Sequence, residues 1–259
     1  MKRLLMLLLL LACSLNPAHA GRTCATKKMS AANFIAGMNL ADKTRAALDA
    51  SGAQVAVVAR VGQDLSRYGL RYSHMAWVWR DSANGRWTVV HELNQCGTAH
   101  SALYRQGLGN FFLDDMFAYE ADVLIPAPLT QNKLAAMLAS ALPLRMHTAR
   151  YNMLAYAFAT DYQNSNQWVL ETYAAAASEL QIGDRVQAQA WLKLAGFRPI
   201  TVNVPAATRL GARLFSANIS FDDHPFGRRA AGMIDTVTVE SVLQFLRARE
   251  KLGQEVVVR

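Results

Sequence analysis

The stretch Tyr72-Ser-His-Met-Ala-Trp-Val-Trp79, the turn Asp81-Ser-Ala-Asn-Gly85 and the stretch Val89-Val-His-Glu-Leu93 decide the fold of this chain. Apolar and aromatic residues dominate the first and third stretches, as is typical of β-strands. The Asn-Gly pair between them is a turn signal, so the segment predicts a β-hairpin. Each strand of this hairpin carries one histidine, His74 and His91.

The orientation of His74 follows from the alternation of side chains along a strand. We expect it to share one face with Ala76 and Val78, and Trp77 and Trp79 to point to the other face. A histidine in this position could be a catalytic group, because imidazole titrates near neutral pH, or a core residue with its polar atoms satisfied.

The rest of the chain predicts one α+β domain without repeats, linkers or an internal boundary. Helical spacing and cap signals predict helices, and short apolar runs ended by turns predict strands. The expected helices cover residues 30–50, 99–105, 130–142, 164–180, 184–196 and 242–251. Ser30 is the candidate N-cap of the first helix, and Gly52 is its expected stop. The expected strands cover residues 54–60, 72–80, 86–93, 120–125, 200–204 and 236–240, and residues 107–115 are expected to form a loop.

The N-terminus has the pattern of a secretory signal peptide. Met1-Lys-Arg3 is basic, residues 4–12 form an apolar run, and Ala18-His-Ala20 is a cleavage signal followed by Gly21. The run is shorter than the about 20 residues that a membrane-spanning helix needs, and no later segment is long and apolar enough. We therefore expect a periplasmic or secreted chain, without a transmembrane segment after signal cleavage.

Cleavage after Ala20 would leave one domain, residues 21–259, with a length of 239 residues that can bury a proper core. A lipoprotein signal that ends at Cys13 is the alternative. Removal of Lys2 and Arg3 leaves 25 basic against 19 acidic residues, a net charge of +6 without basic runs. This charge suits contact with a cell-envelope polymer, peptide or lipid, or simply aids solubility, and export argues against a nucleic-acid partner.

Two cysteines, Cys24 and Cys96, would remain after cleavage. In an oxidising compartment such a pair can form a disulfide, which would pin the N-terminal arm to the sheet. A reactive Cys96 is the alternative, because Gln95-Cys-Gly97 superficially resembles a thiol-protease motif. Against it, Cys96 follows a strand and does not open a clear helix, and such short matches do not transfer between families.

A second polar segment, Tyr162-Gln-Asn-Ser-Asn-Gln-Trp168, opens the later helix. Ser165 lies in its first turn, where the helix dipole and free backbone N–H groups favour negative charge. It is a candidate nucleophile if a base lies beside it, and otherwise a helix cap. Asn166, Gln167 and Trp168 suit recognition of a sugar or peptide, or buried hydrogen bonding that fixes the start of the helix.

The segment Asp222-Asp-His-Pro225 contains possible metal ligands. Adjacent residues point in different directions, and no second ligand set at helical spacing accompanies them, so a turn is favoured. We therefore expect neither a metal nor another cofactor.

The hairpin and the later helix resemble the permuted papain-like superfamily. The hairpin looks like the histidine-bearing hairpin of lecithin:retinol acyltransferase relatives, and Asn164-Ser-Asn-Gln-Trp-Val169 is similar to the start of their nucleophile helix, where cysteine stands. The match covers about 40 scattered residues. It implies a circularly permuted papain-like core with an antiparallel sheet and packed helices, as in NlpC-type cell-wall peptidases.

This resemblance implies roles for particular residues. His74 would be the base, and His91 or another polar group would orient it. Ser165 would attack an acyl carbon, and Asn164 or Gln163 would assist the oxyanion. Serine in place of cysteine is a departure that usually silences such a site, since serine stays protonated until it attacks. Two functions remain open: a hydrolase or acyltransferase acting on acyl or peptide bonds of cell-envelope material, and a non-catalytic envelope-binding protein that retains the cleft.

The whole mature chain is also similar to an uncharacterised bacterial family, domain of unknown function 2145. This resemblance spans nearly the full length, and it implies no known activity. The stretches that carry it are Arg60-Val-Gly-Gln-Asp-Leu-Ser66, Tyr68-Gly-Leu-Arg-Tyr-Ser-His74, His91-Glu-Leu-Asn94, Gly107-Leu-Gly-Asn-Phe-Phe-Leu-Asp114 and Gln163-Asn-Ser-Asn-Gln-Trp168.

Overall fold

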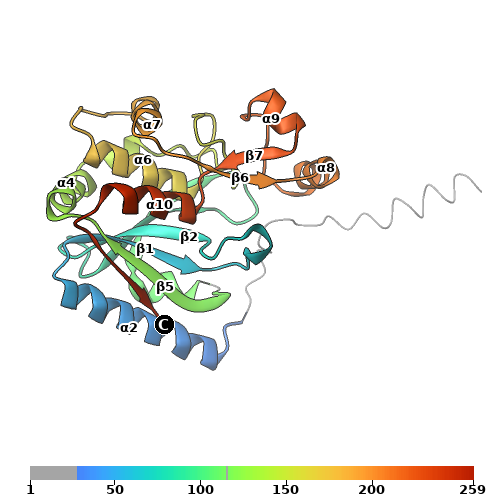
Figure 1. Cartoon of the computed structure of the whole chain (residues 1–259). Helices are drawn as coiled ribbons and strands as arrows, with labels where there is room; N and C mark the ends of the chain where they lie inside the picture. The colour runs from blue at the N-terminus through green and yellow to red at the C-terminus, as the bar shows by residue number, and fades with distance from the viewer. Residues whose placement is uncertain (1–27, 115) are drawn as a thin grey trace, which may run out of the picture.

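A six-stranded antiparallel sheet lies at the centre of the computed structural model, which describes residues 28–114 and 116–259 (Figure 1). The strands follow the order β4-β3-β2-β1-β5-β8. Their bounds are β1 (Val55–Val61), β2 (His74–Trp79), β3 (Thr88–Asn94), β4 (Ser101–Gly107), β5 (Ala118–Ile125) and β8 (Gln254–Val258). The predicted hairpin is confirmed, because β2 pairs antiparallel with β3 and Trp77 lies opposite Val90.

Helices cover both faces of this sheet, so the predicted α+β class is confirmed (Figure 1). One face packs against α2 (Ala31–Ser51) and α3 (Leu108–Leu113). The other face packs against α4 (Pro128–Leu138), α6 (Ser165–Ala177) and α10 (Val239–Arg249), with α7 (Arg185–Leu194) beside α6 and α5 (Leu142–Arg145) beside α4. A short 3-10 helix, Ser66–Tyr68, precedes β2.

A smaller unit projects from one end of the sheet (Figure 1). It contains the two-stranded sheet of β6 (Ile200–Asn203) and β7 (Met233–Thr236), with α8 (Ala206–Phe215) and α9 (Phe226–Ala230) between them in the chain. Its own apolar cluster is small and is formed by buried Val202, Val204, Phe221 and Ile234.

Alternation along β2 divides its side chains between two cores. Met75, Trp77 and Trp79 belong to the core beneath α6, and Ala76 and Val78 belong to the core beneath α2 and α3. The predicted division of this strand is therefore confirmed. The two cores are separate apolar layers, and the sheet lies between them.

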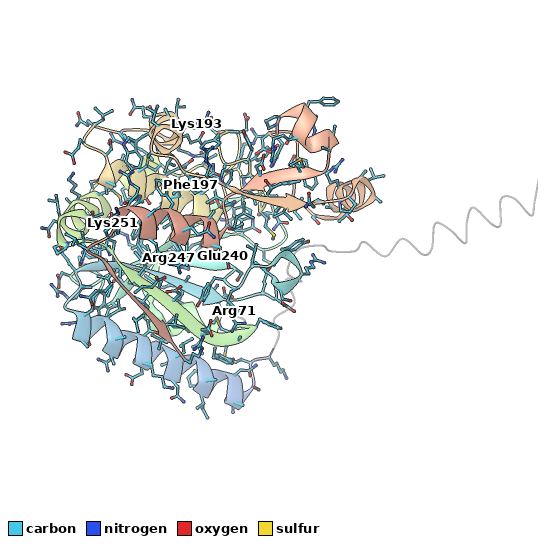
Figure 2. The ribbon with its side chains drawn as sticks, viewed as in Figure 1. Arg71, Lys193, Phe197, Glu240, Arg247 and Lys251 are labelled. Carbon is cyan, nitrogen blue, oxygen red and sulfur yellow. The ribbon has the colours of Figure 1, made fainter. Side chains whose placement is uncertain are left out.

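The α6 layer is fixed by polar as well as apolar contacts. The indole Nε1 of Trp77 donates to Thr172 Oγ1 at 2.9 Å, and the fully buried Trp168 donates to the carbonyl of Pro143 at 3.2 Å. On the same layer, Glu240 of α10 accepts backbone N–H bonds from Arg71 at 2.5 Å and Tyr72 at 2.7 Å, just before β2 (Figure 2). These bonds hold both helices in register with the hairpin.

Several element predictions are wrong. Residues 101–107 form the edge strand β4 and not a helix, because seven residues pair with β3 in one continuous register. The expected loop at 107–115 contains α3. The expected strand at 236–240 ends at Thr236, and Thr238 caps α10 with a capping box. The strand β8 and the helices α8 and α9 were not predicted.

The N-terminal predictions are only partly within the described chain. Ser30 caps α2 by accepting from Asn33 N, and Gly52 ends the helix with φ of 68°, as the sequence predicts. The signal peptide at residues 1–20 lies outside the described residues. Within residues 28–114 and 116–259, no helix combines the length and apolar character needed to cross a membrane.

A buried ion pair joins α6 to α7. Arg185 Nε lies 2.7 Å from Glu171 Oε2, and both side chains are almost completely buried. Gln163 and Gln189 also donate to Glu171, each at 2.7 Å. Arg185 further donates to Thr148 and to carbonyls of the segment that leads into α6. This network positions the start of α6.

We predict that Arg185→Met lowers the free energy of unfolding by about 3–5 kcal/mol, because it leaves the Glu171 carboxylate buried without its charge partner. Urea unfolding followed by circular dichroism measures the change. Arg198→Met is the control, since Arg198 is exposed, and it should change the value by less than about 0.5 kcal/mol. Equal, small effects of the two substitutions would contradict this account of the network.

Candidate functional site

The two hairpin histidines contact each other. His74 Nε2 lies 2.8 Å from His91 Nδ1, and both rings pack against Phe111 of α3. His74 is 9% exposed and His91 is completely buried. Burial, together with the nearby positive charge of Arg60, lowers the pKa of His91 to about 3, so this imidazole is neutral at physiological pH.

Ser165 lies on the opposite side of the sheet from this pair. It is the first residue of α6, which packs on the face that carries Met75 and Trp77. The histidines lie with Phe111 in the layer under α3. The sheet therefore separates them from Ser165, and the predicted roles of His74 as its base and His91 as the orienting group are wrong.

Tyr151 and Glu92 lie near Ser165 instead. Burial, with a smaller contribution from the charge of Glu92, raises the pKa of Tyr151 to about 12, and the nearby Ser165 side chain lowers it only in part. Glu92 follows His91 in β3 and so points to the α6 face, where its charge acts on Tyr151. Sequence analysis missed both residues, although the alternation that places Val90 under α6 also places Glu92 there.

Glu92 is fully buried, and neither carboxyl oxygen has a well-formed hydrogen bond with a described residue. Burial is the main reason that the pKa of Glu92 rises to about 8, and a nearby Ser101 hydroxyl lowers it only in part. Ser101 Oγ lies 3.0 Å from His147 Nε2, and burial lowers the pKa of His147. Glu92, on the sheet face that α6 covers, is therefore a neutral carboxylic acid at pH 7.

The two predicted oxyanion amides have internal partners. Gln163 is fully buried, donates to Met146 O at 2.9 Å and to Glu171, and accepts from Thr148 N at 2.7 Å. Asn164 is the N-cap of α6, where its side chain accepts from Gln167 N. Its amide nitrogen donates to Thr236 and to two carbonyls, Met153 O and Val237 O. These bonds leave neither amide directed at a substrate, so both predicted roles are corrected to structural ones.

The predicted recognition residues are also mostly structural. Gln167 and Trp168 are fully buried, and their side chains donate to the main-chain carbonyls of Tyr156, Ala157 and Pro143. Asn166 is half-buried, and its Oδ1 has no hydrogen-bond partner among the described residues. Burial places Gln167 and Trp168 out of reach of a ligand, so their predicted substrate-binding role is wrong.

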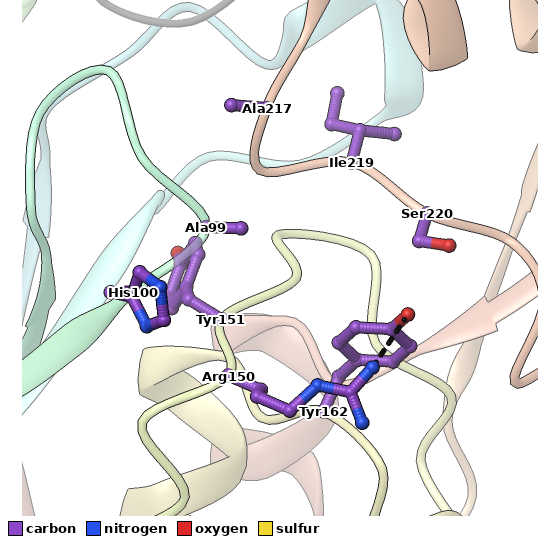
Figure 3. Close-up of a pocket in the computed structure, with 8 residues that line it drawn as sticks. All are labelled: Ala99, His100, Arg150, Tyr151, Tyr162, Ala217, Ile219 and Ser220. Carbon is purple, nitrogen blue, oxygen red and sulfur yellow. Dashed lines mark hydrogen bonds between the residues drawn. The ribbon is translucent and has the colours of Figure 1, made fainter.

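A cavity of about 280 Å³ opens beside Tyr151 (Figure 3). Three segments that are far apart in the sequence form its walls. They contribute Ala99 and His100, then Arg150, Tyr151 and Tyr162, and finally Ala217, Ile219 and Ser220. Tyr151 thus belongs both to the cavity wall and to the buried group with Ser165.

Hydrogen bonds between the loops hold the cavity walls. Tyr151 N donates to Ala99 O at 2.8 Å, and Asn218 Nδ2 donates to Asn94 Oδ1 at 3.1 Å. Asn94 in turn donates to the carbonyl of His100 at 2.8 Å. Asn94 therefore connects the first and third wall segments, and hydrogen bonds fix the positions of the cavity walls.

The remaining sequence candidates do not add to this site. Cys96 is disulfide-bonded, so the alternative of a reactive Cys96 thiol is wrong, and Cys24 lies outside the described residues. Asp223 accepts from Tyr156 N and pairs with His224 at 2.9 Å within a turn, as the sequence favours. In the described part of the chain, no group of three or more histidine, cysteine or acidic side chains is arranged to hold a metal ion.

Comparison with protein families places the chain in a family. The model of a family described as uncharacterised proteins conserved in bacteria, DUF2145, matches residues 47–246. The chain belongs to the DUF2145 family. Comparison of this DUF2145 chain with the curated proteins and with the solved structures gives no significant match. The permuted papain-like resemblance stays a prediction.

The buried carboxyl of this DUF2145 protein predicts a specific pH dependence. The pKa of Glu92 is about 8 in the folded chain and 4.5 ordinarily. Between these values the folded chain binds more protons than the unfolded chain, so this group's contribution to stability is lost as pH rises. Gln does not titrate, so the free energy of unfolding of Glu92→Gln should rise relative to that of the wild type as pH increases across this interval. The rise should be at most about 1.4 kcal/mol per pH unit, and it should level off above the interval.

Urea unfolding of both proteins across this pH interval measures the difference. Glu179→Gln is the control, because the Glu179 side chain is 89% exposed. Its stability relative to wild type should stay nearly constant with pH. A constant difference for Glu92→Gln as well would mean that Glu92 is not held neutral in the folded chain.

Proposed function

We propose that this chain is an exported, non-catalytic binding protein of the cell envelope, and that it holds a small ligand in the cavity beside Tyr151. The observation that carries this proposal is the separation of Ser165 from the His74–His91 pair by the sheet. A serine needs a neighbouring base to become a nucleophile, and the two hairpin imidazoles lie in the other layer.

The groups that do lie near Ser165 are poor bases. Glu92, with a pKa of about 8, is protonated at neutral pH. Tyr151, with a pKa of about 12, holds its proton still more firmly. A general base must be unprotonated at the working pH to accept the serine proton. Ser165 therefore lies near Tyr151 as part of the first turn of α6, without a base to accept its proton.

The cavity supports ligand binding on two grounds. Its volume of about 280 Å³ is close to the lower end of the range of about 300–1,000 Å³ that small-molecule sites occupy. Its lining combines two tyrosine rings and three aliphatic side chains with one arginine, one histidine and one serine, a composition that suits a sugar unit or short peptide. The second proposed class of partner, lipid, would need a longer apolar channel.

Export is part of the proposal. The N-terminal sequence has the pattern of a signal peptide, with a basic start, an apolar run and a small-x-small site. The disulfide at Cys96 also agrees with an oxidising compartment such as the periplasm.

We predict that Ala217→Trp abolishes binding of soluble peptidoglycan fragments, because the indole would fill a cavity that the small alanine side chain leaves open. Isothermal titration calorimetry with the purified mature chain measures this. Ala136→Trp is the control, since Ala136 is exposed on α4 and away from the cavity, and it should bind as wild type does. Absence of fragment binding by wild type, or equal binding by Ala217→Trp, would overturn the proposed site.

We predict that a fluorophosphonate probe does not label the wild-type chain, because Ser165 has no base to activate it. Gel fluorescence after incubation with the probe measures labelling. Labelling that disappears in Ser165→Ala but persists in an exposed-serine control, Ser140→Ala, would show an activated Ser165. That result would replace the binding proposal with the hydrolase or acyltransferase function.

A further inference from the structure

We propose that the cavity beside Tyr151 holds its ligand through an anionic group, a carboxylate or a phosphate, and that Arg150 is the residue that binds this group. The inference rests on the proposed binding function and adds to it the chemical class of the ligand. The position of the Arg150 guanidinium group and the hydrogen-bond partners of Tyr162 and Ser220 support this assignment.

Arg150 is held in place on the cavity wall by an aromatic ring. Its guanidinium carbon lies 4.6 Å from the centre of the Tyr162 ring, and its Nη2 donates to the Tyr162 hydroxyl at 3.2 Å. Figure 3 shows the side chain lying along that ring. Stacking on an aromatic face fixes the plane of a guanidinium without using its N–H donors.

Most donors of Arg150 remain available. A guanidinium has five N–H donors, and in the described chain its side chain reaches one acceptor, the Tyr162 hydroxyl. No ion pair joins it to a carboxylate among the described residues. Other ordered arginines do have such partners: Arg60 with Asp114, Arg71 with Glu120, Arg185 with Glu171 and Arg247 with Glu255.

Asp222, which shares the Tyr162 hydroxyl with Arg150, accepts hydrogen bonds from hydroxyl groups. Asp222 accepts from the Tyr162 hydroxyl at 3.1 Å and from the Ser220 hydroxyl. Both of these hydroxyl hydrogens are therefore directed at Asp222 and away from a ligand. Arg150 and His100, whose backbones are paired in an antiparallel β-bridge, are left to supply the donors of the cavity.

A planar guanidinium with free donors fits the two oxygens of a carboxylate or phosphate in a bidentate arrangement. Removal of such a contact also leaves the rest of the cavity intact, because Arg150 is exposed and its loss opens no core. The inference therefore predicts a loss of affinity confined to anionic ligands.

Three sugars that share one ring test this inference. N-acetylglucosamine is neutral, N-acetylmuramic acid adds a lactyl carboxylate to that ring, and N-acetylglucosamine 6-phosphate adds a phosphate. We expect calorimetry with the mature chain to show at least tenfold tighter binding of one or both anionic sugars than of the neutral sugar. The carboxylate and phosphate arms identify which anion the cavity prefers.

The variants assign this preference to a residue. Arg150→Gln should remove the tenfold advantage, and Arg150→Lys should retain part of it, since the positive charge stays but the bidentate geometry is lost. Arg145→Gln is the matched control, because Arg145 is also exposed and lies on α5, and it should keep the full advantage. Circular dichroism confirms that each variant is folded.

Equal affinity for all three sugars, or an advantage that survives in Arg150→Gln, overturns the anionic inference. In that case, binding that is still lost in Ala217→Trp keeps the proposed function. Absence of binding for all three sugars also overturns the inference, and the proposed function is then judged by the peptidoglycan-fragment experiment alone. The two failures are therefore distinguishable.

Discussion

Successive side chains on β2 and β3 point to opposite faces of the central sheet, and helices cover both faces. This constraint determines which polar groups can meet. On β3, His91 goes to the layer of α3, and its neighbour Glu92 goes to the layer of α6, where Ser165 begins the helix. The start of α6 therefore lies on the sheet face that carries Glu92, and not on the face that carries the imidazole of His91. The chemistry available to Ser165 is therefore set by a shift of one residue along a strand.

Burial then decides the charge of each group in these layers. Glu171 and Glu92 are both fully buried on the α6 side of the sheet, yet only Glu171 has a guanidinium at 2.7 Å and amide donors around it. Burial raises the pKa of both carboxyl groups; Arg185 and the amides oppose this rise at Glu171, whereas Glu92 lacks such partners and its pKa rises to about 8. The same cost of desolvation keeps His91 neutral. Glu171 thus connects α6 to α7 through Arg185, whereas Glu92 carries no charge near Tyr151 at neutral pH.

Local patterns predicted the elements whose signals are strong. The hairpin, the cap of α2 at Ser30 and the division of β2 between two faces all follow from turn, cap and alternation rules. The pattern of β2 cannot say which of its faces receives α6, because that choice depends on packing between distant segments. The prediction for residues 101–107 was wrong for a related reason. The side chains of β4 are mostly half-buried or exposed, and this segment is a strand because it pairs with β3. The cavity was equally beyond prediction, since three separate loops form it.

The position of this cavity within the chain bears on what the family has in common. Its wall residues lie between Ala99 and Ser220, entirely inside the family match over residues 47–246. Strand β8, at the edge of the sheet, and residues 31–46, which form most of α2 on one face of the sheet, lie outside that match. The segment that defines membership thus contains the complete cavity, the α6 start and both buried carboxyl groups. The proposed role of the cavity therefore depends on wall residues within that segment, whereas α2 covers one face of the sheet and β8 extends it.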